Sequence, residues 1–375
     1  MVNDVAVARG RLAMSTAAYR LFAAFARSYE LAFGLSALAT LPAHVLAQPA
    51  APVRGIYNWI HTTGDAEKSF PFYRDVFGIE LARSPFAGPA PPNSPPERIR
   101  PAAEASSDPL VWDLTDTRGA RFRTAFTRAP NTPFGLELPE FFDIPRSTRA
   151  ANPWDPGASM LLFDVRRFDA VLAKLKALRA PIVTLGGNPV DTAAGRAIVV
   201  RDPDGYLVQV TEASAAAMAR ATADAEIVGT SIGIAVADTA ASLDFYRGLL
   251  GFVVRETRHA ASAELRLNGL AEGELVRTTT LIPGTEVRVL FSEFRLPSAP
   301  AVPAAPFRWR IQDVGAPQFQ LEVTGLDSLI ERTKTAGYRF LSVGAKPIRR
   351  PFGRFVFAID PDGVLVELVE PAERP

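Results

Sequence analysis

Glu367 is the residue of this sequence whose type and setting are best suited to chemistry. It lies in IDPDGVLVELVE, which begins at Ile359, and a closely matching stretch, RDPDGYLVQVTE, begins at Arg201 and carries Gln209 at the same place. In both copies Asp-Pro-Asp-Gly forms a turn, because Pro fixes φ and Gly accepts the backbone geometry that follows. A carboxylate can take up and release a proton, whereas an amide only donates and accepts hydrogen bonds.

Glu367 stands among apolar neighbours on the strand that follows this turn. Leu365, Glu367 and Val369 share one face because side chains alternate along a strand. A carboxylate buried there without a partner would be costly and its pKa would rise. Such a residue lies either where a ligand or ion meets it or at an edge that water reaches, and we favour the first. Glu137, in FGLEL, fits the same argument.

The elements that must position these residues recur twice along the chain. DAEKSFPFYRDVFGIEL, from Asp65, resembles DTAASLDFYRGLLGFVV, from Asp238. Each is predicted to be a helix that begins at an Asp N-cap and ends at Gly78 or Gly251, with the FYR residues mostly in core packing. A short extended run precedes each helix, at 55–62 and 229–236, and predicts a strand.

A second strand and helix follow within each half of the chain. Residues 159–165 and 319–323 read as strands, and the helical stripes after them begin at Phe168 and Leu326. The chain therefore contains four strand–helix–strands units, with helices on one face of mostly antiparallel sheets, an α+β fold. The predicted segments are a signal at 1–47, a first domain at 54–213, a linker at 214–227 and a second domain at 228–371. The Pro-rich stretch 84–109 is predicted to be an extended surface loop inserted in the first domain.

Composition narrows the class of partner. The 41 Lys+Arg and 40 Asp+Glu nearly cancel, which argues against nucleic acid and anionic membranes and favours a small-molecule ligand. Cys is absent, so disulfides and thiolate sites are excluded. The first residues combine Arg with the apolar stretch LAFGLSALATL, the layout of a secretory signal with cleavage after Ala47, which predicts a periplasmic or secreted protein. The alternative is an amphipathic leader or a start at Met14.

Taken together, these motifs resemble the vicinal oxygen chelate superfamily, which includes glyoxalase I, bleomycin resistance proteins and extradiol dioxygenases. The resemblance covers nearly all of residues 54–370. It implies two tandem glyoxalase-like domains, each of paired βαβββ units that form a cupped mixed β-sheet. In the family a divalent metal usually lies at the floor of the cup, held by His on the first strand and Glu on the last strand of each unit.

Carried over from the family, the metal-ligand positions hold no His in this chain. Since zinc, nickel and ferrous iron prefer imidazole or several carboxylates, we expect no metal cofactor and no extradiol dioxygenase chemistry. His61 is predicted to face away from Asn58, and His259 to lie in a β-hairpin. The metal-ligand positions that the resemblance implies are, in the first domain, Asn58, Glu137, Met160 and Gln209, and in the second, Ser231, Leu290 or Glu293, Gln318 and Glu367.

Three functions are compatible with these residues. The first is a glyoxalase- or dioxygenase-like enzyme, a lyase or isomerase, with Glu367 or Glu137 as the catalytic acid/base group at a degenerate or absent metal site. Its substrate-binding residues would be the polar positions Asn58, Gln209, Ser231 and Gln318. The second is a metal-free protein that sequesters a small molecule, as bleomycin resistance proteins do. The third is a structural or interaction role without catalysis. Because Glu367 is retained, the second domain is the expected place of any remaining activity.

Overall fold

Each quarter of the chain repeats one unit, in which a strand leads into a helix and then into antiparallel strands. The computed structural model describes residues 51–87, 90–92, 94–297 and 308–373, so the predicted signal at 1–47 lies outside the described residues. The elements of the first half are β1 (Val53–His61), α2 (Ala66–Phe77), β2 (Glu80–Leu81), a 3₁₀ turn (Ala102–Glu104), β3 (Ser106–Ser107), α3 (Pro109–Thr115), β4 (Arg121–Arg128), β5 (Gly135–Phe142), β6 (Ser159–Val165), α4 (Phe168–Ala177), a 3₁₀ turn (Leu185–Gly187), β7 (Val190–Thr192), β8 (Gly195–Arg201), β9 (Leu207–Glu212) and α5 (Ala215–Arg220).

The second half follows the same plan. Its elements are β10 (Ile227–Val236), α6 (Thr239–Leu243), a π-helical turn (Asp244–Leu249), β11 (Val253–His259), α7 (Ser262–Leu267), β12 (Glu274–Leu281), β13 (Arg288–Arg295), β14 (Pro317–Val323), α8 (Leu326–Thr335), β15 (Arg339–Phe340), a 3₁₀ turn (Val343–Ala345), β16 (Ile348–Arg350), β17 (Gly353–Ile359) and β18 (Leu365–Pro371).

The predicted helix ends are confirmed. The carboxylates of Asp65 and Asp238 accept hydrogen bonds from backbone N–H groups of the first turn, and Gly78 ends α2 in the left-handed conformation with φ 72°. The hairpin predicted around His259 is wrong: β11 ends at His259 and the short helix α7 follows. Among the described residues, no helix is long and apolar enough to cross a bilayer.

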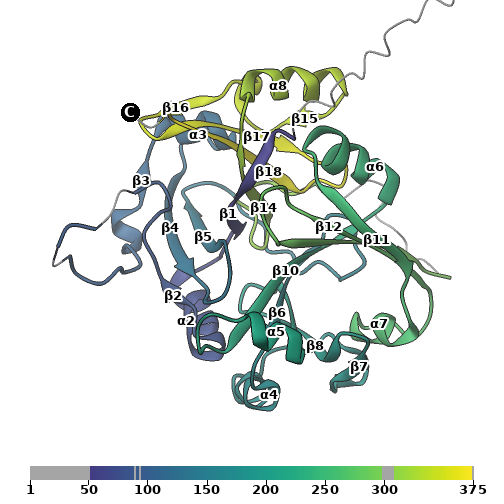
Figure 1. Cartoon of the computed structure of the whole chain (residues 1–375). Coiled ribbons are helices and arrows are strands. Elements are labelled where there is room, and N and C mark those ends of the chain that lie inside the picture. The colour runs from purple at the N-terminus through teal and green to yellow at the C-terminus, as the bar shows by residue number, and fades with distance from the viewer. Residues whose placement is uncertain (1–50, 88–89, 93, 298–307, 374–375) are drawn as a thin grey trace, which may run out of the picture. The chain divides into compact units, whose positions relative to one another are not determined.

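The strands form two curled mixed sheets, and the predicted α+β class is confirmed. The first sheet has the strand order β15-β17-β18-β14-β1-β5-β4-β2, and the second β11-β12-β13-β10-β6-β9-β8-β7. At the centre of each sheet the first strands of two units pair antiparallel, β1 with β14 and β10 with β6. Figure 1 shows β1, near the start of the described chain, beside the late strands β14 and β18.

The units that share a sheet differ from those that the family resemblance suggested. Consecutive units were expected to share a cup, but the first sheet joins units one and four, and the second joins units two and three. Each unit presents the free edge of its first strand, and unpaired backbone groups there must find another strand. β1 satisfies this edge with β14 from the other half of the chain.

Consecutive units contact each other through the helix motif and the Asp-Pro-Asp-Gly turn instead. In the first half, the Tyr73 hydroxyl donates a hydrogen bond to Asp202 at 2.8 Å and Ser69 donates to Asp204 at 2.6 Å. The second half repeats both bonds with the residues Tyr246, Asp360, Ser242 and Asp362. The tyrosine of each FYR motif therefore does more than pack in the core, because it ties its helix to the turn of the following unit.

Helices and aromatic side chains cover both faces of the sheets. The helix-facing sides share one large apolar core that contains Trp59, Phe163 and Phe319. The cup side of the first sheet is lined by a second apolar cluster to which α3 contributes. The Pro-rich segment is more than a surface loop, because its Phe86 packs against Tyr57 and Phe355 in this cluster.

The duplicated tyrosine bonds lead to a stability prediction. Tyr73→Phe and Tyr246→Phe each remove a buried hydroxyl that bonds an Asp of the turn, so we expect each to lower the free energy of unfolding by about 1–3 kcal/mol. Urea unfolding followed by circular dichroism measures this effect. An unchanged midpoint in both variants would show that the turns are held by packing alone.

Candidate functional site

Four polar side chains meet on the cup side of the first sheet, and we call Asn58, Glu137, Gln320 and Glu367 the floor quartet. They come from the four neighbouring strands β1, β5, β14 and β18. Asn58, Gln320 and Glu367 are buried, and Glu137 is partly exposed. The two candidate catalytic carboxyls therefore belong to one cup, although they lie in different halves of the sequence.

The register of the strands creates the floor quartet. Asn58 lies opposite Gln320 in the antiparallel pair β1–β14, and Gln320 lies opposite Glu367 in the parallel pair β14–β18. On the other side, Glu137 pairs with Ile60, two residues beyond Asn58 on the same face of β1. The β1–β14 pairing therefore brings the two sides of the quartet together.

Sequence reasoning placed Gln318 rather than Gln320 at the site. Both residues are on the same face of β14, so alternation alone does not choose between them. Gln318 lies two residues before Gln320 on β14, and its side chain donates to the Thr62 hydroxyl at 3.2 Å. The 158-residue spacing of the two turns aligns Gln320 with Leu162 as readily as it aligns Gln318 with Met160, so the sequence does not single out Gln320. The strand register does, because Gln320 lies opposite Glu367.

The two amides of the quartet bridge its two carboxyls. Asn58 Nδ2 donates to Glu137 Oε2 at 3.2 Å and to Gln320 Oε1 at 2.7 Å. Gln320 Nε2 donates to Glu367 Oε2 at 2.7 Å. This continuous chain of hydrogen bonds fixes the orientation of both carboxyls and leaves each with one oxygen outside it.

Both carboxyls have strongly raised pKa values. Burial raises the pKa of Glu137 from 4.5 to about 8, with a further contribution from the charge of Glu367. Burial also raises the pKa of Glu367 from 4.5 to about 7, against the opposing effect of the Gln320 hydrogen bond. At neutral pH, Glu137 is therefore mostly protonated while Glu367 is partly ionised.

A glycine makes room for the first amide. A Cβ at Gly135 would lie 2.4 Å from Asn58 Oδ1 and 2.6 Å from the carbonyl oxygen of Thr127. No real side chain tolerates such distances, so Gly135 is required for the position of Asn58.

The cup of the second sheet has no carboxyl at the corresponding positions. Ser231 lies opposite Leu162, Leu162 opposite Gln209, and Gly233 opposite Leu290. The residue at this position is therefore Leu162, two residues after the predicted Met160. Leu290, not Glu293, is the counterpart of Glu137.

The remaining predicted site residues have local partners in that second sheet. Gln209 Nε2 donates to the Thr211 hydroxyl at 3.0 Å, and the Ser231 hydroxyl accepts from Arg288 Nε at 3.2 Å. Glu293 accepts from the backbone N–H of Thr239 at the start of α6. Glu367, in the second domain where any remaining activity is expected, belongs to one hydrogen-bonded quartet with Glu137 of the first domain.

His61 lies on the helix-facing side of β1, opposite to Asn58, as predicted. Its Nε2 is hydrogen-bonded to the Tyr73 hydroxyl at 3.0 Å and lies 3.5 Å from Asp202, while its ring stacks on Tyr206. Nδ1 has no hydrogen-bond partner. Burial lowers the pKa of His61 to about 4, so the imidazole is neutral at pH 7.

His61, Asp202 and Asp204 are also the one group of described residues in which three His or acidic side chains approach closely enough to hold a metal ion, with ligand atoms within 4.8 Å. Asp202 accepts from Tyr73 and from two backbone N–H groups, and Asp204 accepts from Ser69 and the Gly64 N–H. All four carboxylate oxygens thus have protein donors. The second half repeats the contacts of the two Asp side chains with Ile234 in place of His61, so the two Asp residues hold the turn with or without a neighbouring His.

The floor quartet does not fit the imidazole-preferring ions of the family. Its donor set is two carboxyls and two amides, and both amides direct N–H groups at the carboxyls. Ligation would require the amides to rotate and break these hydrogen bonds. The predicted absence of a cofactor stays a prediction.

Paired βαβββ units that form curled mixed sheets are the architecture of the vicinal oxygen chelate class of proteins. Residues 58–210 and 230–368 match the model of the Glyoxalase/Bleomycin resistance protein/Dioxygenase superfamily, and the chain belongs to this superfamily. None of the curated proteins matches the sequence.

Solved structures share the fold at low identity. Glyoxalase I from Zea mays has 15% sequence identity and a TM-score of 0.52, covering 84% of this chain and 92% of that chain. A variant of the same enzyme has 17% identity, the same TM-score and the same coverage. A glyoxalase family protein from Bacillus cereus, with 17% identity and a TM-score of 0.31, covers 38% of this chain and 91% of that chain. The two glyoxalase I structures, with TM-scores of 0.52, show similarity of the fold alone.

The raised pKa values lead to a prediction about stability against pH. A carboxyl whose pKa is higher in the folded than in the unfolded chain stabilises the fold below pH 4.5, and this contribution is lost as the pH rises toward 7 or 8. Glu137→Gln and Glu367→Gln keep an acceptor for the amides and do not ionise. The free energy of unfolding of each variant, relative to that of the wild type, should therefore rise by up to about 3 kcal/mol on going from pH 5 to pH 9.

Chemical unfolding at several pH values measures this difference. The buried Asp202 and Asp360, whose pKa values are also raised, remain in every variant and cancel in the comparison. If the difference in free energy of unfolding between variant and wild type stays constant across pH, the two carboxyls have ordinary pKa values.

Proposed function

We propose that the chain binds a small organic molecule in the cup of the first sheet and catalyses proton transfer on it, as a lyase or isomerase. The observation that carries this proposal is the pair Glu137 and Glu367, which are held in one hydrogen-bonded quartet with pKa values near 8 and 7. A general acid and a general base work best when their pKa values lie near the working pH.

The two carboxyls have different roles in this proposal. Glu367 has the lower pKa and acts as the base that removes a proton from the substrate, because its carboxylate form is populated near pH 7. Glu137 has the higher pKa, stays protonated and returns a proton at a neighbouring atom. One proton leaves the substrate and one arrives, so the step is balanced as an isomerisation, and Asn58 and Gln320 hold the carboxyls in place.

The lining of the cup favours an apolar or aromatic substrate. Phe357 lies opposite Glu367 in the β17–β18 pair, and it belongs with Phe355 and Leu365 to the buried apolar cluster against which Tyr57 and Phe86 pack. Such a surface binds a ligand by burial of apolar area while the polar floor orients one functional group.

Sequestration without chemistry is the second candidate, and the same aromatic lining supports it. The two candidates differ in what they require of the carboxyls. A binding protein needs only the shape and polarity of the floor, which a Gln preserves, whereas proton transfer needs a group that ionises.

Hydrogen exchange from substrate carbon distinguishes these candidates. The wild type is incubated in D₂O with a panel of α-hydroxy and α-oxo carbonyl compounds that carry aromatic groups, and deuterium incorporation is followed by ¹H NMR. We expect enzyme-dependent exchange with at least one compound, and Glu367→Gln to reduce its rate by about 10²-fold or more.

The matched control is Gln209→Asn, which changes the counterpart of Glu367 in the other sheet and should leave the exchange rate unchanged. Exchange that survives unchanged in Glu367→Gln would refute the assignment of the base. Saturable binding of a panel compound without exchange in the wild type would establish the sequestration role instead.

A further inference from the structure

Glu367, the proposed base, is enclosed on the cup side of the first sheet, where it is 5% exposed. Leu365 and Val369 flank it on the same face of β18, and Phe357 lies opposite it on β17. All three belong to one buried apolar cluster. Because a carboxyl so enclosed offers almost no surface to a ligand, part of this cover has to move before a substrate can meet it.

The helix α3 is the part of the cover that is built to move. It contributes Leu114 to the same cluster and packs against β16 and β17 (Figure 1). It has seven residues, and isolated helices shorter than about 12 residues are marginal in water, so its stability comes from these contacts. It connects β3 to β4, so it can move while the four strands that carry the floor quartet stay paired.

Each end of α3 is tied to the wall of the cup by a polar contact. At its start, Asp108 caps the helix by accepting from the Leu110 N–H at 2.9 Å and forms an ion pair with Arg350 of β16. At its end, the Leu114 carbonyl accepts from the Ser342 hydroxyl at 2.8 Å. The side chains of Asp108 and Arg350 are 29% and 25% exposed, and an ion pair that water reaches contributes little to stability.

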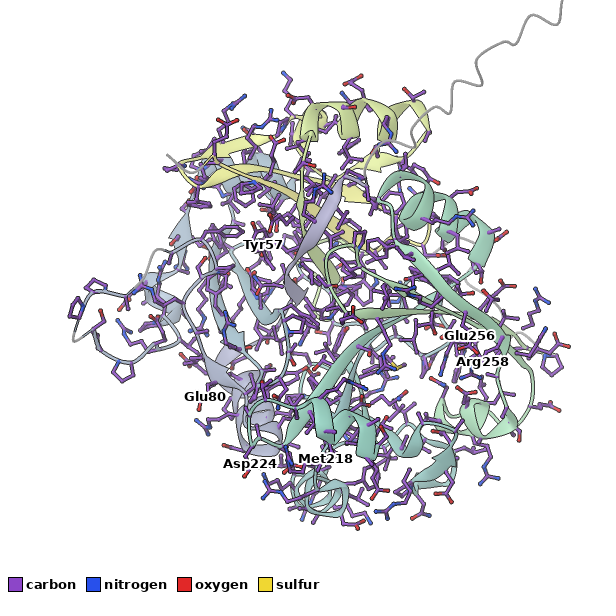
Figure 2. The ribbon with its side chains drawn as sticks, in the orientation of Figure 1. Tyr57, Glu80, Met218, Asp224, Glu256 and Arg258 are labelled. Atoms are coloured by element: carbon purple, nitrogen blue, oxygen red, sulfur yellow. The ribbon has the colours of Figure 1, made fainter. Side chains whose placement is uncertain are left out.

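The short helix α7 occupies the equivalent place over the second cup, and its anchor is stronger. Its Leu267 belongs to the apolar cluster of that cup, and the Leu267 carbonyl accepts from the Thr184 hydroxyl at 3.1 Å. Its Glu264 is buried and accepts from both Arg277 and Arg258, the second of which lies on the edge strand β11 (Figure 2). Breaking a buried pair costs more than breaking a partly exposed one. The cup that contains the two carboxyls therefore has the more easily released helix.

Aromatic rings lead from the surface to the cluster that α3 covers. Tyr57 on β1, labelled in Figure 2, packs against Phe86 with 5.0 Å between ring centroids. Phe86 also contacts Phe355 of the cluster and stacks on Phe352, which is 40% exposed. None of these rings belongs to α3, so they remain as an apolar wall for an entering ligand when the helix moves.

We propose that α3 is a lid over Glu367, which opens to admit a small molecule and closes over it. The proposal rests on the function proposed above and concerns access to the same cup. Opening breaks the ion pair of Asp108 with Arg350 and the hydrogen bond of the Leu114 carbonyl, and it withdraws Leu114 from the cluster. Closing excludes water from the carboxyls during proton transfer.

Carboxyl labelling of the full chain tests the lid without any substrate. A water-soluble carbodiimide with glycinamide converts accessible carboxyls to amides, and tandem mass spectrometry reads the rate at each residue. Asp108→Asn keeps an N-cap for α3 but removes the ion pair, and Arg350→Gln removes the ion pair from the other side. Each should raise the labelling rate of Glu367 about 3-fold over the wild type. Arg349→Gln, which removes an exposed arginine from the same strand, should leave this rate unchanged.

Asp202 serves as the internal control, because it is buried on the helix-facing side and should stay slow in every variant. Equal labelling of Glu367 in the wild type, Asp108→Asn and Arg350→Gln would overturn the proposal. So would a parallel rise of Asp202, since the whole fold would then have loosened. Faster labelling of Glu367 alone, without deuterium exchange on any panel compound, would support the lid and contradict the catalytic function, so the two failures are distinguishable.

Discussion

The antiparallel pairing of β1 with β14 is the interaction on which the site depends. It joins the first and last units of the chain in one sheet, and it sets Asn58 opposite Gln320. Through Gln320 the register extends to Glu367, and through β5 it extends to Glu137. Neither half of the chain on its own contains both carboxyls. The backbone hydrogen bonds that satisfy the edges of two strands therefore also assemble the functional groups.

The duplicated architecture shows which features are structural and which are specific to one copy. Both halves use a tyrosine and a serine of the helix motif to hold the two Asp side chains of the turn. The floors of the cups differ in chemistry, with two carboxyls in the first sheet and an arginine held by Glu264 beside the second. The repeated bonds explain why the turn persists in both halves while Glu367 and Gln209 diverge.

Much of the fold could be predicted from the sequence because its signals are local. Asp65 and Gly78 define a helix by capping, and alternation places Glu367 on a single face of its strand. The meeting of Glu137 with Glu367 could not be predicted, because repeats show which units are alike but not which strand edges pair over a long sequence separation. Gln320 was missed for the same reason, since only its partner strand distinguishes it from Gln318. The helix α7 escaped prediction because it is six residues long and is held by the ion pair of Glu264 with Arg277, a tertiary contact.

The direct test of the account is a ¹³C NMR titration of the two carboxyl groups, assigned with the single Gln variants. If the two carboxyls share one cup, Glu137 titrates near pH 8 and Glu367 near pH 7 in the wild type. The pKa of Glu137 then falls in Glu367→Gln, because the neighbouring charge that raises it is removed. Two independent titrations near pH 4.5, unchanged by substitution of the other residue, would contradict the assembly of the site from both ends of the chain.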